Sequence, residues 1–243
     1  MKKAIGYVYV IAAAVCWSFL GLFNRVLTAA GASLLNMMPL RFGGTAILFT
    51  VFCMMFKQQV FHIKLRHLPI FLGSGLISML LALCGCALVS GIVGSDVGIS
   101  LEGLLMGLAS ELCYGGYTIF THYGMRYCDS FTMAYWTFLI AGIASLFLAD
   151  GPALLSALAE PRTGLAALGL MVMGTALPFT LYTKGLETVE SGKAAIIANI
   201  EPVMSAVIGV TVFQETLGLW TLVGIVLVLS GVVVLACEKE PDK

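Results

Sequence analysis

Charge is the property that this sequence has least of. Only 11% of its 243 residues are Asp, Glu, Lys or Arg, whereas 60% are hydrophobic and the mean hydropathy is +1.01. So few charged residues cannot cover the surface of a water-soluble globular protein of this length. Basic and acidic residues number 13 each and no basic patch stands out, so no nucleic-acid partner is expected. The composition predicts an integral membrane protein whose main partner is the lipid bilayer.

Sequence motifs of enzymes are also missing. There is no glycine-rich phosphate-binding loop and no Gly-x-Ser-x-Gly nucleophile turn. The four aspartates all fall outside the long apolar runs, which excludes the paired carboxylates of an intramembrane aspartyl protease. The seven cysteines have no spaced histidine partners, so we expect them to pack as small apolar side chains. We therefore expect no enzymatic activity, no cofactor and no metal site.

Long apolar runs fill most of the chain. A transmembrane helix needs about 20 mostly apolar residues to cross about 30 Å of hydrocarbon, and each run is of about that length. The runs are apolar on every side and do not alternate every second residue, which indicates helices. The predicted fold is therefore an all-α polytopic membrane protein. Eight spans are expected, near residues 5–28, 35–56, 68–93, 101–121, 131–149, 164–183, 194–213 and 219–237.

Positive charges are distributed unevenly between the two sides of these spans. With the N-terminus placed in the cytoplasm, ten Lys or Arg residues lie in inner loops and tails, and only Arg162 lies in an outer loop. Cytoplasmic loops carry an excess of Lys and Arg, so this distribution predicts that both termini are cytoplasmic. The expected location is the cell membrane, with the chain as a multi-pass protein.

A weak internal repeat is present. Residues 75–78 resemble residues 174–177, and residues 83–89 resemble residues 229–235. The separation is 99 residues at the first match and 146 at the second, so about 47 residues of the later copy have no counterpart in the earlier one. The junction is expected near residue 81, within one helix.

This repeat divides the chain into two predicted domains. Residues 1–95 form an incomplete first repeat with three spans, and residues 96–243 form a complete second repeat with five spans. Two repeats with an odd number of spans have opposite orientations in the membrane, which is a usual construction of secondary transporters.

Three stretches carry a resemblance to a known family. They are residues 12–19 with Asn24 and Arg25, residues 39–44, and residues 194–215 with Glu201 and Pro202. In order and spacing they resemble the EamA domain of the drug/metabolite transporter superfamily. The resemblance implies ten spans in two inverted five-helix repeats around a central cavity, and transport of small metabolites, often amino acids. It predicts a secondary transporter, an exporter of small organic metabolites, that works by alternating access.

The shortened first repeat leaves a second hypothesis open. The family helices that are missing here help to line the cavity. The chain is then either a transporter, or a transport-inactive deletion variant, or a membrane protein that regains the missing helices by forming a homo-oligomer.

Charged residues inside the predicted spans are candidates for function, because a charged group in hydrocarbon costs about 2.5–3.5 kcal/mol. Glu111 lies near the middle of the fourth span and forms a polar stripe at helical spacing with Tyr114 and Thr118. It is either a protonated carboxyl bonded to a neighbouring helix, or a ligand for a substrate amine or a coupling proton. Arg41 lies about 9 Å into the second span, where a structural role is expected.

Aromatic residues in several spans are the second group of candidates. Trp17, Tyr114, Tyr117 and Tyr182 would line a cavity for an organic cation or an aromatic metabolite, although packing roles are commoner for such residues. The predicted substrate pathway consists of Glu111, Tyr114, Tyr117, Thr118, Trp17, Ser18, Tyr182 and Asn199.

Two prolines predict broken helices. Pro202 leaves the carbonyl of Ala198 without its usual amide partner, and Pro178 does the same to Gly174. Asn199 lies beside the first of these breaks. Hinge or structural roles are assigned to Glu201, Pro202, Pro178 and Arg41.

Overall fold

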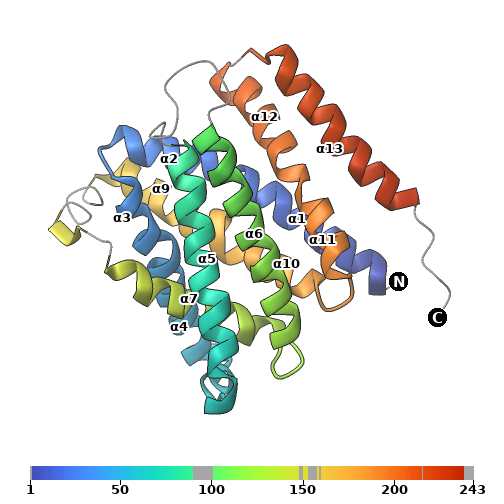
Figure 1. The fold of residues 1–243 in the computed structure, drawn as a ribbon. Coiled ribbons are helices and arrows are strands. Elements are labelled where there is room, and N and C mark those ends of the chain that lie inside the picture. Colours follow the sequence, from blue (N-terminus) through green and yellow to red (C-terminus); the bar gives the residue numbers. More distant parts are fainter. Residues whose placement is uncertain are drawn as a thin grey trace.

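The computed structural model describes residues 2–89, 101–147, 150–152, 158, 160–214 and 216–237. These residues form helices and their connections, and no strand is found among them (Figure 1). The predicted all-α fold is therefore confirmed. Each of the eight predicted spans coincides with one helix or with consecutive helical segments in the described part of the chain.

Four spans are made of more than one segment. The first consists of α1 (Lys2–Ser18) and α2 (Leu20–Ala29), and the second of α3 (Leu34–Met38), the π-helix η1 (Pro39–Gly44) and α4 (Thr45–Phe56). The sixth consists of α9 (Pro161–Met171), the π-helix η4 (Val172–Ala176) and α10 (Leu177–Gly185), and the seventh of α11 (Ser191–Ala198) and α12 (Ile200–Phe213). These are also the four stretches of the described chain that are long and apolar enough to cross a membrane.

The other four predicted spans are single helices. They are α5 (Leu68–Val89), α6 (Leu101–Gly124), α7 (Ser130–Leu146) and α13 (Leu219–Cys237). Two short 3₁₀ turns, η2 (Gln58–Phe61) and η3 (Leu65–His67), lie between α4 and α5. Helix α5 continues without a break through residue 81, where the repeat junction is expected. The division into repeats 1–95 and 96–243 stays a prediction.

Three of the four broken spans have a proline at or beside the break, whereas the first span, broken at Phe19, contains none. Pro39 opens η1, and Pro178 is the second residue of α10, directly after η4. Proline has no amide hydrogen and its ring clashes with the carbonyl four residues earlier, so a helix widens or ends there. In the seventh span α11 ends at Ala198 and α12 begins two residues later, with Pro202 in its first turn. The helices are interrupted at both prolines for which the sequence predicts it.

The two π-helices lie against each other. The Oγ1 atom of Thr45 donates a 3.1 Å hydrogen bond to the carbonyl of Met171, just before η4. Thr175 Oγ1 donates a 3.0 Å hydrogen bond to the carbonyl of Leu170. A Cβ atom on Gly44 would lie 2.6 Å from the Met171 Cε atom, so the missing side chain permits this close contact. The hydroxyl groups supply partners for carbonyls beside the widened turns, as the dry bilayer interior requires.

The helices form one bundle. Helix α1 packs along α10, α5 packs along α6 and α7, and α12 and α13 lie side by side at one edge (Figure 1). Val10, Phe42 and Phe138 are fully buried in the centre. Large apolar side chains such as Leu112 and Phe147 are exposed on the outside, where lipid would cover them.

Candidate functional site

Five aromatic side chains meet inside the bundle, on α1, α6 and α10. This aromatic cluster consists of Trp17, Tyr114, Tyr117, Phe179 and Tyr182. The ring centroid of Trp17 lies 5.1 Å from that of Phe179 and 5.4 Å from that of Tyr182. Tyr114 lies 5.8 Å from Tyr182, and Tyr117 lies 5.4 Å from Phe179. The structure thus brings together the four aromatic residues that the sequence singles out.

Phe179 is a member of the cluster that sequence reasoning missed. It follows Pro178 and lies three residues before Tyr182 on α10. Residues at this spacing share one face of a helix, so the position of Tyr182 in the sequence also indicates Phe179 as a candidate.

Polar atoms of the cluster are only partly hydrogen-bonded. Thr118 Oγ1 donates a 2.9 Å hydrogen bond to the carbonyl of Tyr114 and lies 3.1 Å from the Tyr182 hydroxyl. The indole Nε1 of Trp17 is buried and has no hydrogen-bond partner among the described residues, and the buried hydroxyl of Tyr114 interacts with that of Tyr182. A buried donor without a partner costs about 1–3 kcal/mol, and such groups are often where water or a ligand binds. The cluster therefore combines an apolar wall with a polar atom that a ligand would satisfy.

Two other predicted pathway residues have different surroundings. Ser18 is buried next to Trp17, but its hydroxyl donates a 2.6 Å hydrogen bond to the carbonyl of Val15 in its own helix. Its carbonyl accepts a 3.4 Å hydrogen bond from Ser205 on α12. Asn199 is exposed at the break between α11 and α12, and the structure does not bring it into the aromatic cluster.

The charged candidates differ in their surroundings. The backbone of Glu111 belongs to α6, and its side chain lies outside the described part of the structure. Glu201 is partly buried in the first turn of α12 and interacts electrostatically with Tyr114. The guanidinium carbon of Arg41 lies 5.4 Å from the ring centroid of Phe42 within η1, a cation–π contact.

A second site opens at the end of the bundle where α1 and α7 begin and α4 and α10 end. We call it the charged pocket. It has a volume of about 420 Å³ and is lined by Tyr9, Lys57, Asp129, Ser130, Phe131, Thr180, Leu181, Lys184 and Glu187.

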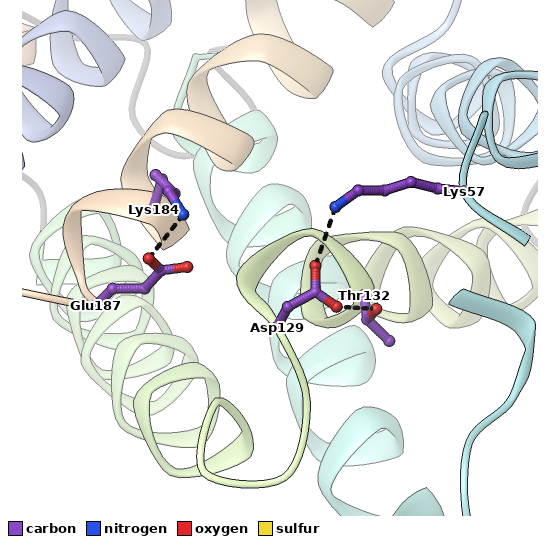
Figure 2. Close-up of polar contacts among 5 residues, drawn as sticks. All are labelled: Lys57, Asp129, Thr132, Lys184 and Glu187. Atoms are coloured by element: carbon purple, nitrogen blue, oxygen red, sulfur yellow. Dashed lines mark hydrogen bonds and ion pairs between the residues drawn. The ribbon is translucent and has the colours of Figure 1, made fainter. Parts of the chain in front are cut away.

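Two ion pairs face this space (Figure 2). Lys57 Nζ lies 3.3 Å from Asp129 Oδ2, and Lys184 Nζ lies 2.8 Å from Glu187 Oε2. The hydroxyl of Thr132 donates a hydrogen bond to the other carboxylate oxygen of Asp129. Partial burial raises the pKa of Asp129, but the hydrogen bond from Thr132 and the charge of Lys57 outweigh it, so the pKa is lowered from its ordinary value. Asp129 is therefore a carboxylate at neutral pH.

A line of rings joins the charged pocket to the aromatic cluster. Phe131, in the wall of the pocket, has its ring centroid 5.0 Å from that of Phe49. Phe49 lies 5.6 Å from Phe138, and Phe138 lies 5.1 Å from Phe179 in the cluster. The two sites are thus connected through the interior by side chains of α4, α7 and α10.

Broken membrane-spanning helices around a buried group of aromatic and hydroxyl side chains are the construction of a polytopic membrane transporter. Comparison with known proteins identifies the family of transporters. Residues 101–237 match the EamA-like transporter family, and the chain belongs to this family. The match confirms the predicted resemblance, and its range includes four members of the aromatic cluster.

The relatives with curated names include uncharacterized transporters and a multidrug resistance protein. An uncharacterized transporter of Archaeoglobus fulgidus is 41% identical over 68 residues, which are 28% of this chain and 25% of the relative. The uncharacterized transporter YwfM of Bacillus subtilis is 27% identical over 170 residues, 69% of this chain and 56% of the relative. The multidrug resistance protein EbrB of Bacillus atrophaeus is 32% identical over 87 residues, 35% of this chain and 74% of the relative. The chain thus spans only about a quarter to just over half of the first two relatives.

Proposed function

We propose that this membrane transporter exports a small organic metabolite, such as an amino acid, by alternating access. The indole N–H of Trp17, which has no hydrogen-bond partner among the described residues of the aromatic cluster and its surroundings, carries the proposal. A solute carbonyl or carboxylate placed there would accept this hydrogen bond and recover a free energy of about 1–3 kcal/mol. The surrounding rings would contact the apolar part of the solute.

The helix breaks supply the movement that alternating access needs. Transport around a central site requires one group of helices to tilt against the other. The widened turns η1 and η4 are points at which a span bends at low cost, and they lie in contact with each other. The proposal places the protein in the cell membrane with both termini in the cytoplasm, so the charged pocket would open to the cytoplasm.

Removal of the indole N–H is the direct test of the central site. In proteoliposomes loaded with a panel of labelled amino acids, Trp17→Phe is expected to raise the KM of the transported compound about tenfold, because a hydrogen bond of about 1.4 kcal/mol is lost. The matched control is Trp136→Phe, since Trp136 Nε1 already donates a 2.9 Å hydrogen bond to the carbonyl of Val60. This control is expected to lower thermal stability and to leave KM unchanged. A similar KM in the two variants, or no flux of any compound, would refute the proposed role.

A homo-oligomer is proposed as the second possibility, and α13 is the helix that supports it. Gly224 and Gly231 lie seven residues apart on one face of α13, and a Cβ atom on either would meet no atom of the described residues within 4 Å. An open face with small residues permits close packing of two helices in a bilayer. Single-molecule photobleaching in liposomes is expected to show two copies for the natural sequence and mainly one for Gly224→Leu with Gly231→Leu. One copy for both proteins would remove the oligomer hypothesis.

A further inference from the structure

The charged pocket has no role in the transport proposed above, which takes place at the aromatic cluster. We propose that it binds a small zwitterion, a molecule with one ammonium and one carboxylate group, at the mouth of the transport route. The inference rests on the proposed transport, because a route through the bundle is what gives a site at its end a function.

The charges of the pocket favour a zwitterion over a simple ion. Lys57 and Lys184 supply two ammonium groups, and Asp129 and Glu187 supply two carboxylates, so the four charges sum to zero. A zwitterion would offer its carboxylate to the lysines and its ammonium to the acids, and the pocket would stay neutral. A lone cation or anion would satisfy one pair of charges only.

The ion pairs are open to exchange of partners. The side chains of Lys57 and Asp129 are 50% and 53% exposed, and those of Lys184 and Glu187 are 50% and 33% exposed. Ion pairs that are this accessible to water contribute little to stability, so their replacement by a ligand costs little. All four residues line the pocket, one pair on α10 and the turn after it and the other between α4 and α7 (Figure 2).

The apolar part of the pocket lining would contact the uncharged side chain of the zwitterion. Tyr9, Phe131 and Leu181 line it beside the charges. A volume of about 420 Å³ lies within the range of about 300–1,000 Å³ that is usual for small-molecule sites. An amino acid with an apolar side chain matches this combination of charged and apolar lining.

The position of the pocket connects it to transport. Phe131 begins the line of rings that ends in the aromatic cluster. Lys57 follows α4 and Asp129 precedes α7, so their ion pair is a contact between two spans at this end of the bundle. A zwitterion that takes over both partners would release this link as it enters the route.

Binding to the full chain in nanodiscs tests the proposal with a zwitterion and analogues that lack either its carboxylate or its ammonium group. Phenylalanine is compared with phenethylamine and 3-phenylpropionate, and leucine with isoamylamine and 4-methylpentanoate. At least one of the two zwitterions is expected to bind about tenfold more tightly than its cationic and anionic analogues. Added salt is expected to weaken this binding, because the charges are exposed.

Variants locate the binding. Lys57→Gln and Asp129→Asn are each expected to weaken zwitterion binding about fivefold, and Lys57→Arg, which keeps the charge, is expected to retain most of it. The matched control is Glu190→Gln, since Glu190 is exposed in the same loop as Glu187 but does not line the pocket. The thermal stability of each variant is measured as well, and only variants as stable as the natural sequence are compared. A loss of binding then cannot be caused by unfolding.

The outcomes separate this inference from the proposed function. Three results would overturn the pocket site, even where flux persists. They are equal binding of the three compounds in both series, failure of both zwitterions to bind, and unchanged binding when Lys57→Gln and Asp129→Asn are combined. If these changes abolish zwitterion binding but the protein transports none of the compounds, the pocket site is supported and the proposed transport is refuted.

Discussion

Replacement of Gly142 by alanine is expected to lower the midpoint of thermal unfolding by about 10 °C, which corresponds to a loss of about 3 kcal/mol in the free energy of unfolding. A Cβ atom on Gly142 would lie 2.9 Å from the Cα and 3.0 Å from the N of Gly43, and 3.2 Å from the carbonyl carbon of Phe42. All three are backbone atoms, which cannot rotate aside as a side chain would. Relief requires α7 to move away from η1.

That separation is costly in a bilayer. Lipid tails are as apolar as the helix surfaces, so helices are held together by close packing and not by a hydrophobic effect between them. The contact between α7 and η1 also positions Phe138 against Phe42, whose ring centroids lie 6.3 Å apart in the centre of the bundle. Movement of α7 would therefore disturb the core as well as the contact itself.

Gly43, on the other side of the same contact, provides the matched control. A Cβ atom on Gly43 would meet no atom within 4 Å in the part of the chain that the structure describes. Gly43→Ala is therefore expected to leave stability unchanged or slightly raised, since alanine loses less backbone entropy than glycine. Fluorescence-detected size-exclusion chromatography after heating measures both variants in parallel. If Gly142→Ala melts at the temperature of the natural sequence, the close approach of these backbones is not what stabilises the bundle.

The spans could be predicted because they depend on local composition. Hydrophobicity averaged over about 20 residues locates a membrane helix, and the first predicted span, 5–28, corresponds to α1 and α2 over residues 2–29. Proline positions predicted the breaks at Pro178 and Pro202 for an equally local reason. The widened turn η1 at Pro39 was not predicted, because the effect of a proline near a span end depends on what packs against it.

The candidate site could be predicted only in part. Trp17 and Tyr182 were identified from residue type and span position, and the structure places them together. Asn199 is a candidate because it lies beside a helix break, but the rotation of the broken helix about its axis leaves it exposed, and the local sequence does not fix that rotation. The pairing of Lys57 with Asp129 joins residues 72 positions apart, and such pairing arises only from the fold.

Pro178→Ala is expected to make the protein more stable and its transport at least tenfold slower. Alanine restores an amide hydrogen that can bond to the carbonyl of Gly174, and in a helix interior alanine is favoured over proline by about 3 kcal/mol. We expect a net gain of about 1 kcal/mol, because the buried surroundings of Pro178 are shaped to the bent helix. The widened turn η4 would then tend to revert to a regular α-helix.

The lower transport rate of Pro178→Ala follows from the same straightening of the helix. If the sixth span bends at η4 during each transport cycle, a straighter helix resists that bend, and an added barrier of about 1.4 kcal/mol slows flux tenfold. Pro161→Ala is the matched control, because Pro161 occupies the first position of α9, where its missing amide interrupts no helical bond. Flux in proteoliposomes and thermal stability are measured for both variants, and the control is expected to change neither. Flux that is unchanged in Pro178→Ala, or reduced equally in Pro161→Ala, would mean that the break at Pro178 shapes the fold without serving as the hinge.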